Sequence, residues 1–519
     1  MSEIPAVDDT GGRQRRRGSK RGRSAAALPV QPPFAQPRLT YAPSPAVSDD
    51  HLEAIHDASL VVLSEIGLDF LHPEALATLA AAGASVDGER VRFDPELVMQ
   101  LISTAPSSFT LHSRNPDHDL VIGGDYVSFS AVASAPNVAD LAGGRRTGNM
   151  ADFDGLTKLG QMLNAVHFWG GYPVEPVDVH ASVRHLHTLH SQLTMSDKAV
   201  HAYSLGADRN LDVMEMARIA RGIDDTTLDE EPSVFSVINV SSPLRLDTPM
   251  LQGIIEFSSR NQCIVLTPFT LAGAMAPVTV AGAVVQQNAE ALAGIAFTQA
   301  VRPGAPVVYG GFTSNVDMQS GAPAFGTPEY MKSAMLGGQL ARRYGLPYRS
   351  SNVSASNAVD TQAGYESVFS LWGAILGGAN MVFHGAGWME GGLHASYEKM
   401  LIDADLLQMI AEWLKPLALD ADSLGLDAIR EVGPGGHFFG AEHTQSRYKT
   451  AFYKPMVSDW RNYESWEEAG SPHTATRASK VVTDLIAAHE DPPMDQAIRA
   501  ELDDFVARRV AEGGVATDF

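Results

Sequence analysis

The spacing of apolar residues along the first part of the chain predicts helices and one small hairpin. Apolar residues recur at helical spacing from residue 49 onward and stop at Gly67, a residue type that often ends a helix. The predicted elements are a helix over 49–66, helices over 73–82 and 95–104, and a β-hairpin of strands 84–86 and 89–92 with Asp87-Gly88 as its two-residue turn. We expect these elements to form an N-terminal cap over residues 46–120.

Farther along, short apolar runs alternate with longer helical patterns, which predicts parallel βα units. The predicted strands are 127–130, 165–169, 199–203, 233–238, 263–266, 306–309, 347–351 and 380–384. The predicted helices between them include 211–221, 280–300, 330–344, 365–377 and 397–414. Eight such strands, with no G-x-G-x-x-G turn after the first, favour a (βα)8 TIM barrel over a doubly wound sheet. The predicted α/β fold is a barrel over 121–420 followed by a mostly helical extension over 421–519.

Composition indicates a soluble enzyme with a large core. The 519 residues are 45% hydrophobic, and the net charge of −23 argues against a nucleic-acid-binding surface. No apolar run reaches the ~18–20 residues that a membrane span needs, and no secretory signal opens the chain, so we expect a cytoplasmic protein. The single cysteine, Cys263, excludes an internal disulfide and is expected to be a small buried side chain.

The first 45 residues differ in composition from the rest. Seven Lys and Arg residues lie between Arg13 and Arg23, and Pro, Ala and Ser are frequent after them. This composition predicts a disordered basic arm. The arm could contact nucleic acid or an acidic partner, but a solvated tail without a specific role is the simpler interpretation. Twin arginines without a following apolar segment do not form an export signal.

Residues capable of chemistry follow the predicted strands. In a (βα)8 enzyme the active site lies at the carboxyl ends of the strands. These ends hold many aromatic residues, Arg349, His384 and small polar groups, but no cluster of carboxylates with histidine that would hold a divalent metal. Aromatic faces attract quaternary ammonium groups, and a guanidinium pairs with a carboxylate. The pattern therefore predicts a ligand with a cation at one end and a carboxylate at the other.

Roles for individual residues follow as hypotheses. We expect Arg349 to bind a substrate carboxylate, and the alternative is a salt bridge that ties the seventh strand to a loop. His384 is the catalytic candidate, lining the pocket as a hydrogen-bond donor or packing beside the ammonium, although a lone histidine is more often structural. Glu390 could coordinate polar groups, but the simpler interpretation is that it accepts backbone hydrogen bonds in its glycine-rich loop. We expect two or three aromatic residues to contact the ligand and the others to be core. The candidates are Trp388, Phe168, Trp169, Tyr172, Tyr309 and Phe312.

A group of histidines precedes the third predicted strand. His185, His187 and His190 lie in one helical stretch, and His187 and His190 could share a face. Neither has a carboxylate or cysteine nearby in the sequence. We therefore interpret the group as a solvated helix face rather than a zinc site, and predict that this chain binds no metal.

Several stretches, in the same order along the chain, resemble the trimethylamine methyltransferase family. The longest is HGAGWMEGGLHASYEK over 384–399. The others are 276–279 (APVT) with 281–283 (AGA), 288–294 (NAEALAG), 360–366 (DTQAGYE), 432–438 (VGPGGHF), and 450–453 (TAFY) through Asp459. The resemblance runs from about residue 50 to the C-terminus.

The resemblance implies a TIM barrel that passes a methyl group from a methylated amine to the Co(I) of a corrinoid carried by a separate protein. Archaeal members that demethylate trimethylamine carry pyrrolysine in the loop after the seventh strand, where this chain has the ordinary residues 354–357 (SASN). This departure argues against trimethylamine as the substrate. The chain instead resembles the non-pyrrolysine branch of the family, whose known members demethylate quaternary amines such as glycine betaine. A quaternary amine leaves as a neutral molecule, so no activating adduct or proton is needed.

The regions after the predicted barrel indicate protein partners. The glycines of 433–436 and the aromatic-rich run over 448–466 are expected near the barrel mouth, where they would help dock the corrinoid protein. The helical patterns over 474–489 and 494–509 could serve homo-oligomerisation. The alternative function is a non-catalytic betaine-binding or corrinoid-protein scaffold of the same fold. Carnitine and proline betaine also fit as substrates, because the choice is set by pocket volume.

Overall fold

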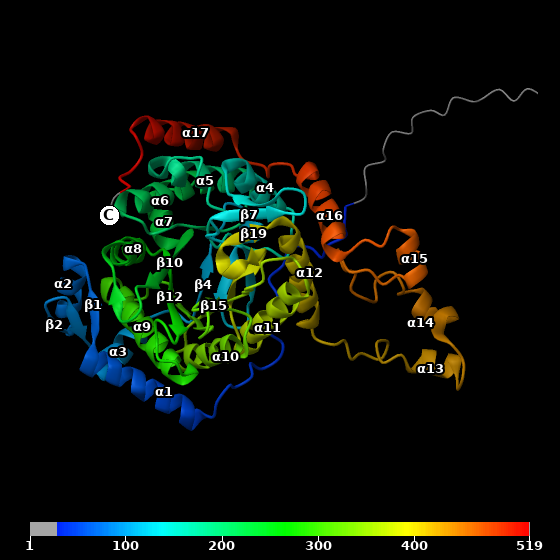
Figure 1. The fold of residues 1–519 in the computed structure, drawn as a ribbon, viewed down its shortest axis with the longest axis horizontal. Helices are drawn as coiled ribbons and strands as arrows, with labels where there is room; N and C mark the ends of the chain where they lie inside the picture. The colour runs from blue at the N-terminus through cyan, green and yellow to red at the C-terminus, as the bar shows by residue number, and fades with distance from the viewer. Residues whose placement is uncertain (1–27, 518–519) are drawn as a thin grey trace, which may run out of the picture.

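The computed structural model describes residues 28–517 and has a mixed α/β architecture (Figure 1). The N-terminal elements are α1 (Asp49–Val61) with a π turn over Val62–Ile66, β1 (Leu68–Phe70), α2 (Pro73–Ala82), β2 (Ser85–Asp87), β3 (Arg90–Arg92) and α3 (Pro95–Ile102). Gly67, with a φ of 76°, ends the first helix as predicted. The predicted hairpin turn is wrong by one residue. Asp87 pairs with Arg90, so that Gly88 and Glu89 form the turn, and the φ of 63° at Gly88 favours glycine.

Parallel strands occupy the centre of the molecule. In chain order they are β6 (Ser128–Ala131), β9 (Val200–His201), β10 (Val234–Val240), β12 (Cys263–Ala272), β13 (Val307–Gly310), β16 (Tyr348–Ser351) and β17 (Met381–Ala386). From β9 to β17 each pairs in parallel with the next, and β17 pairs with β6. The predicted strand over 165–169 is reduced to Phe168, which makes single parallel bridges with Ser130 and Ala199. Together with these two bridges, the parallel pairings form a closed ring that starts at β6, passes through Phe168 and then β9 to β17, and returns to β6.

Helices surround these strands in Figure 1. They are α4 (Met150–Gln161), α5 (Ala181–Met195), α6 (Ala207–Arg221), α7 (Asp225–Glu230), α8 (Thr248–Ser259), α9 (Val280–Val301), α10 (Pro328–Arg343), α11 (Thr361–Gly377) and α12 (Tyr397–Trp413). Because helices cover one face of the strands and core side chains the other, the strands appear in the sequence as continuous apolar runs without alternation. That continuity made them recognisable, but it concealed which face each residue occupies.

A hairpin of β4 (Ser108–Leu111) and β5 (Leu120–Gly123) contributes to the interior of this strand arrangement. Its side chains form one buried cluster with residues of the parallel strands. The members include Leu111, Leu120, Ile122, Phe168, Phe235, Cys263 and Phe383. Cys263 is buried and free, as predicted, and burial raises the pKa of its thiol.

Several short strands were not predicted. They are β7 (Asn137–Asp140), β8 (Gly144–Thr147), β11 (Arg245–Leu246), β14 (Phe312–Val316), β15 (Pro323–Ala324), β18 (Trp388–Met389) and β19 (His394–Ser396). β7, β8, β18 and β19 form a separate small sheet, so the segment after β6 lies beside the segment after β17. This second sheet positions the glycine-rich stretch that follows β17.

The C-terminal helices return to the body of the molecule. α16 (Thr474–Ala488) packs on α12 and α4, and α17 (Gln496–Ala511) packs on α5 and α6. Between α12 and α16, the chain leaves the body. In Figure 1 the helices α13 (Leu426–Val432), α14 (Glu442–Gln445) and α15 (Tyr463–Glu468) lie beside the body rather than over it.

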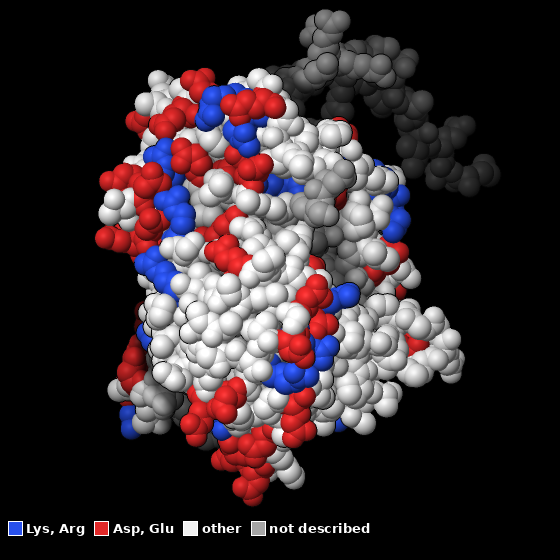
Figure 2. All heavy atoms as spheres, turned by 90° about the vertical axis from the view of Figure 1, so that its left-hand side faces the viewer, with Lys and Arg blue, Asp and Glu red and all other residues white. Residues whose placement is uncertain are grey.

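Residues 28–45, which their composition assigns to the basic arm, lie along the body. Gln31 Nε2 donates to the carbonyl of Met162 at 2.8 Å, and Arg38 forms an ion pair with Asp125 at 2.8 Å. The basic run from Arg13 to Arg23 lies outside the described residues. Between residues 28 and 517, none of the helices combines the length and apolar character that crossing a membrane requires. Figure 2 shows acidic and basic side chains interspersed on one side of the molecule, so the charge of that side is mixed.

Candidate functional site

A cavity of about 480 Å³ lies at the carboxyl ends of the parallel strands. This volume falls within the ~300–1,000 Å³ typical of small-molecule sites. Four residues selected from the sequence line it together: Arg349, His384, Trp388 and Phe312. Among the described residues of the lining, Arg349 is the only Lys, Arg, Asp or Glu. The cavity is therefore an apolar, aromatic space with one fixed positive charge.

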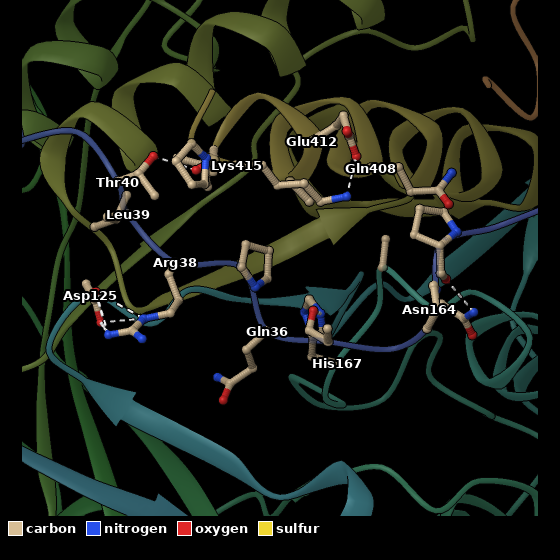
Figure 3. Close-up of a pocket in the computed structure, with 18 residues that line it drawn as sticks. Gln36, Arg38, Leu39, Thr40, Asp125, Asn164, His167, Gln408, Glu412 and Lys415 are labelled. Atoms are coloured by element: carbon tan, nitrogen blue, oxygen red, sulfur yellow. Dashed lines mark hydrogen bonds and ion pairs between the residues drawn. The ribbon is translucent and has the colours of Figure 1, made fainter. Parts of the chain in front are cut away.

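A larger hollow, of about 700 Å³, lies at the opposite, amino-terminal end of the strands (Figure 3). Segment 32–40 and the end of α12 form its walls. Its charged groups are already paired: Arg38 with Asp125, and Lys415 with Glu412 at 2.6 Å. Its lining is mostly apolar, and among its described residues only the amide of Gln408 is buried without a hydrogen-bond partner. The smaller cavity, which holds an unpaired charge and several polar groups, is therefore the candidate active site.

Arg349 lies in β16 with only 3% of its surface exposed. Its guanidinium carbon lies 4.6 Å from the ring centre of Phe383 and 5.3 Å from that of Phe312, and Nη1 donates to the carbonyl of Gly311 at 3.3 Å. Nε is buried without a partner, and no carboxylate of residues 28–517 forms an ion pair with Arg349. Burial lowers the pKa of Arg349 to about 10, so the side chain is charged at neutral pH. A buried guanidinium of this kind is prepared to receive an anion.

His384 occupies a distorted position in β17. The pairing of β17 with β6 shifts register between Val382 and Ala386, and His384 itself has a φ of 53°. Such bulges redirect a side chain, and positive φ in a non-glycine residue is a strain found at functional sites. The His384 N–H donates to Ser130 Oγ at 3.0 Å, while Nδ1 of the ring is buried without a partner. Burial, reinforced by the charge of Arg349, holds the pKa of His384 well below its usual range, so the ring is neutral.

An aromatic wall, which consists of Phe312, Phe325 and Trp388, lies beside Arg349 and His384. Trp388 lies 5.1 Å from Phe325 and 6.2 Å from Phe312 between ring centres, and it stacks on His384 at 5.4 Å. The two phenylalanines are 5.7 Å apart. The three rings meet edge to face and all three line the cavity. Aromatic rings of this kind bind alkylammonium groups.

Backbone geometry fixes the position of Trp388. The preceding Gly387 has a φ of 102°, and its N–H donates to Asp403 Oδ2 at 2.9 Å. Asp403 in turn pairs with Lys399, and both side chains are almost completely buried in α12. Gly392, with a φ of 95°, lies so close to the indole that a Cβ there would come within 2.8 Å of Trp388 Cζ2. The glycines and the buried ion pair together hold the indole against the cavity.

His201 and Tyr203 also line the cavity, although neither was among the predicted site residues. Their place at the end of the predicted strand 199–203 is the signal that could have identified them. The N–H of Val237 donates to His201 Nε2 at 3.2 Å, so in the neutral ring Nδ1 carries the proton. This Nδ1–H is buried without a partner, and burial lowers the pKa of His201 to about 3. Tyr203 OH accepts from the N–H of Tyr172 at 3.0 Å and lies 2.7 Å from Ser134 Oγ. His201 therefore presents an unused hydrogen-bond donor.

The remaining aromatic candidates lie elsewhere. Phe168 packs inside the strand arrangement against Phe235 and Phe383. Trp169 Nε1 donates to Ser196 Oγ at 2.9 Å, and Tyr309 OH donates to Asn288 of α9 at 2.9 Å. Tyr172 lies against Tyr203 with ring centres 4.6 Å apart and borders a small neighbouring hollow. None of the four lines the cavity within the described part of the chain.

Comparison with known proteins identifies the family. The family described as trimethylamine methyltransferase (MTTB) matches residues 12–514. The chain belongs to this family, and it is a methyltransferase. A glycine betaine methyltransferase of Desulfitobacterium hafniense strain Y51 is 36% identical over 469 residues, which cover 90% of this chain and 98% of that protein. A trimethylamine methyltransferase, MttB, of D. hafniense strain DCB-2 is 30% identical over 480 residues, covering 90% and 95%.

A solved structure shows a weaker similarity. The monomethylamine methyltransferase of Methanosarcina barkeri has a TM-score of 0.45 and 10% identity, with 88% of each chain covered. This similarity is too low to decide the fold.

In this member of the family, the loop after β16 supports the loop after β17. Ser354 Oγ donates to Glu366 Oε2 at 2.8 Å, and the N–H groups of Ala355 and Ser356 donate to the same oxygen. The carbonyls of Ser354 and Ser356 accept hydrogen bonds from Gly391 and Glu390, respectively. Ser354 and Ser356 thus support the glycine-rich loop, whose Gly391 lines the cavity, through their backbone carbonyls.

Glu390 is engaged by other side chains rather than by the backbone hydrogen bonds expected from the sequence. It forms ion pairs with Arg145 at 2.7 Å and with His394 at 2.9 Å. Burial opposes ionisation of this carboxyl, but the hydrogen bonds from His394 and Arg145 outweigh it and lower the pKa. Glu390 therefore joins β8, β19 and the glycine-rich loop.

The histidine group in α5 has carboxylate partners that the sequence did not reveal. His185 Nε2 lies 2.9 Å from Asp212, which also binds Arg509, and His190 Nε2 lies 2.6 Å from Asp503. The prediction of a purely solvated face is therefore wrong for His185, which is buried. Across residues 28–517, no three His, Cys, Asp or Glu side chains are grouped so as to hold a metal ion.

Proposed function

We propose that this chain transfers a methyl group from a quaternary amine that carries a carboxylate, glycine betaine or a close analogue, to the Co(I) of a corrinoid brought by a partner protein. The observation that carries the proposal is the pairing of one unneutralised guanidinium, Arg349, with the aromatic wall in one cavity. Membership of the methyltransferase family and 36% identity to a glycine betaine methyltransferase support it.

The cavity discriminates between kinds of cation by its charge. A simple cation such as choline would meet Arg349 without an anion to neutralise it, and like charges repel strongly in an apolar space. A betaine brings its own carboxylate, which the fork of Arg349 can bind in two parallel hydrogen bonds. The His201 Nδ1–H is a further donor available to a carboxylate oxygen.

The neutral histidines fit a reaction that needs no acid. The methyl–nitrogen bond breaks with its electron pair staying on nitrogen, so a neutral tertiary amine leaves, and the methyl group passes to Co(I), which supplies the electron pair of the new bond. No proton moves, so the low pKa values of His384 and His201 are compatible with this chemistry. The chain's contribution is to remove water from the cation, orient one methyl group and hold the carboxylate.

We further propose that the parallel strands form a (βα)8 barrel over 121–420, with 46–120 as its cap and 421–519 as its extension. The closed circuit of parallel pairings through β6 and β17 supports this. Sites of such barrels lie at the carboxyl ends of the strands, where Arg349 and His384 lie. The corrinoid would be a substrate delivered to this end.

The affinities of three related ligands measure the contributions of Arg349 and of the aromatic wall separately. We expect calorimetric titration to give glycine betaine an affinity about 10–100-fold above that of choline, which lacks the carboxylate. Its affinity should be about 30-fold above that of 3,3-dimethylbutyrate, which keeps the carboxylate but has a neutral carbon in place of the ammonium nitrogen. The first difference reports Arg349 and the second the aromatic wall. Equal affinity for all three ligands, or no binding of glycine betaine, would overturn the proposal.

A further inference from the structure

The outer face of α11 has an unusual composition. Its exposed and half-exposed positions carry no Asp, Glu, Lys or Arg, and the one acidic residue of the helix, Glu366, is buried. In a chain with 61 acidic residues, solvent-facing helices normally carry charge. We define the apolar stripe as the following side chains: Tyr365, Val368, Phe369 and Trp372 of α11, Met409 and Trp413 of α12, and Tyr41.

The apolar stripe is continuous between the helices. Trp413 lies 4.8 Å from Trp372 and 4.8 Å from Tyr41 between ring centres. Tyr, Trp, Phe and Met are the residues enriched in protein interfaces, and charged residues are depleted at the interface core. The composition of the stripe is that of an interface rather than of a solvated helix face.

A second set of exposed apolar side chains begins where α12 ends. We call residues 417–470 the arm. Its exposed apolar side chains are Leu417, Leu419, Leu424, Leu426, Ile429, Phe438, Phe439, Tyr448, Phe452, Trp460 and Tyr463. Phe439 and Phe452 are more than 80% exposed, and Trp460 is 74% exposed. The arm lies beside the body in Figure 1 and its short helices bury few side chains, so it has no core of its own.

The arm is attached to the body at a defined place. Tyr453 OH and the N–H of Val457 donate to Asp405 of α12, and Arg477 of α16 donates to the carbonyl of Val457 at 2.9 Å. These contacts hold the segment 453–457 of the arm against α12. On both sides of this attachment the arm lies beside the body, as α13, α14 and α15 show in Figure 1, and its apolar side chains can reach another molecule.

The area is sufficient for a stable contact. Aromatic side chains present ~150–250 Å² each, so the five aromatic residues of the arm that are more than half exposed offer on the order of 700 Å². A standard interface takes about 800 Å² from each partner. Two arms exchanged reciprocally would reach this size even before the apolar stripe is added.

The position of these surfaces indicates which partner covers them. The arm begins beside the hollow of Figure 3, at the amino-terminal end of the strands. Trp413 and Tyr41, which adjoin residues of the hollow, and Trp372, which packs on Trp413, lie at that end too, and the stripe runs from them along α11 to Tyr365 near the start of the helix. A protein that delivers cobalt must contact the opposite end, where the cavity lies. The root of the arm, which follows Lys415 and Pro416 of the hollow, therefore lies at the end of the strands away from the cavity.

We propose that a second copy of this chain covers these surfaces, with the arm of each copy lying over the apolar stripe of the other. Closed two-fold association lets both arms bury their apolar side chains and leaves no surface unpartnered. The hollow beside the stripe would receive apolar side chains of the partner's arm. The inference does not depend on the methyl-transfer reaction.

Solution mass tests the proposal. Full-length protein at micromolar concentration should show, by light scattering after size exclusion, a mass of at least twice the 55.5 kDa of one chain. Phe369→Glu in the stripe and Phe439→Glu in the arm should each shift the protein to monomer and weaken association at least 100-fold. Leu211→Glu, on α6 and 51% exposed, is the matched control and should leave the mass unchanged. Circular dichroism checks that each variant is folded.

Cross-linking tests the reciprocal arrangement. Because Cys263 is buried, Phe369→Cys and Phe439→Cys each introduce one accessible thiol. Mixing the two single variants under oxidation should give a disulfide-linked pair of chains that neither variant forms alone. A monomeric wild-type protein, glutamate variants that stay associated, or glutamate variants that lose only the contact with the corrinoid protein would each overturn the proposal.

Discussion

Replacing Arg349 by alanine is expected to raise the KM for glycine betaine about 100-fold or more. The guanidinium lies between two phenylalanine rings, without a carboxylate partner among residues 28–517, so the substrate would supply its counter-charge. Losing one member of a buried, hydrogen-bonded charge pair costs about 2–5 kcal/mol, and about 2.8 kcal/mol corresponds to 100-fold. Steady-state kinetics across betaine concentrations measures the change.

Two controls test whether the effect of Arg349→Ala comes from lost binding of the substrate carboxylate. Arg349→Lys keeps the charge but loses the two-pronged geometry, so its KM should fall between those of wild type and Arg349→Ala. Binding of choline, which has no carboxylate, should not weaken in Arg349→Ala. An unchanged KM for betaine, or an equal loss for choline, would remove the carboxylate role. Thermal unfolding is measured alongside, because Arg349 also donates to Gly311 and packs against Phe312 and Phe383.

Asp403→Ala is expected to destabilise the protein by about 3–5 kcal/mol, the usual cost of leaving one member of a buried ion pair alone. Asp403 and Lys399 are each 1% exposed, and Lys399 Nζ also donates to Ser367 Oγ at 2.6 Å. The same carboxylate accepts the N–H of Gly387, which precedes Trp388. The substitution should therefore also disorder the indole at the cavity. The urea midpoint of unfolding measures the first effect and betaine affinity the second.

The same helix region offers a matched control for Asp403. Glu412 and Lys415 form an ion pair at 2.6 Å but are 41% and 62% exposed. Glu412→Gln should change stability by less than about 1 kcal/mol, because exposed pairs contribute little. Replacing Lys399 and Asp403 together by Met and Leu should recover part of the loss seen in Asp403→Ala. If Asp403→Ala and Glu412→Gln shift the midpoint equally, the buried pair is not what holds the loop.

The sequence predicted the site best where strand order decides the position. Arg349 and His384 follow neighbouring strands, and the carboxyl ends of parallel strands meet, so their common cavity could be predicted. Which residues of a buried strand face the interior could not be predicted. Phe168, Trp169 and Tyr309 lie in runs that are apolar on both sides, so nothing in the pattern tells which residue faces the interior and which faces a helix.

Other parts of the site depend on contacts between distant segments. Phe325 joins the aromatic wall because it directly follows β15, which pairs with β14. His201 has a free Nδ1–H only because the hydrogen bond from Val237 fixes the tautomer of the ring. The partner of His190, Asp503, lies 313 residues away. The aromatic residues of the arm were visible in the sequence, but only the structure shows that they leave the body.

One measurement tests the methyl-transfer proposal most directly. Purified protein is mixed with free cob(I)alamin and one equivalent of glycine betaine, and the methylated cobalamin is followed by its absorbance while the amine product is identified by mass spectrometry. We expect stoichiometric N,N-dimethylglycine and methylcobalamin, and no transfer from trimethylamine. Glycine betaine that binds but yields no methylcobalamin would contradict the assignment and make the chain a binding scaffold. Transfer from trimethylamine at a comparable rate would contradict the role given to Arg349.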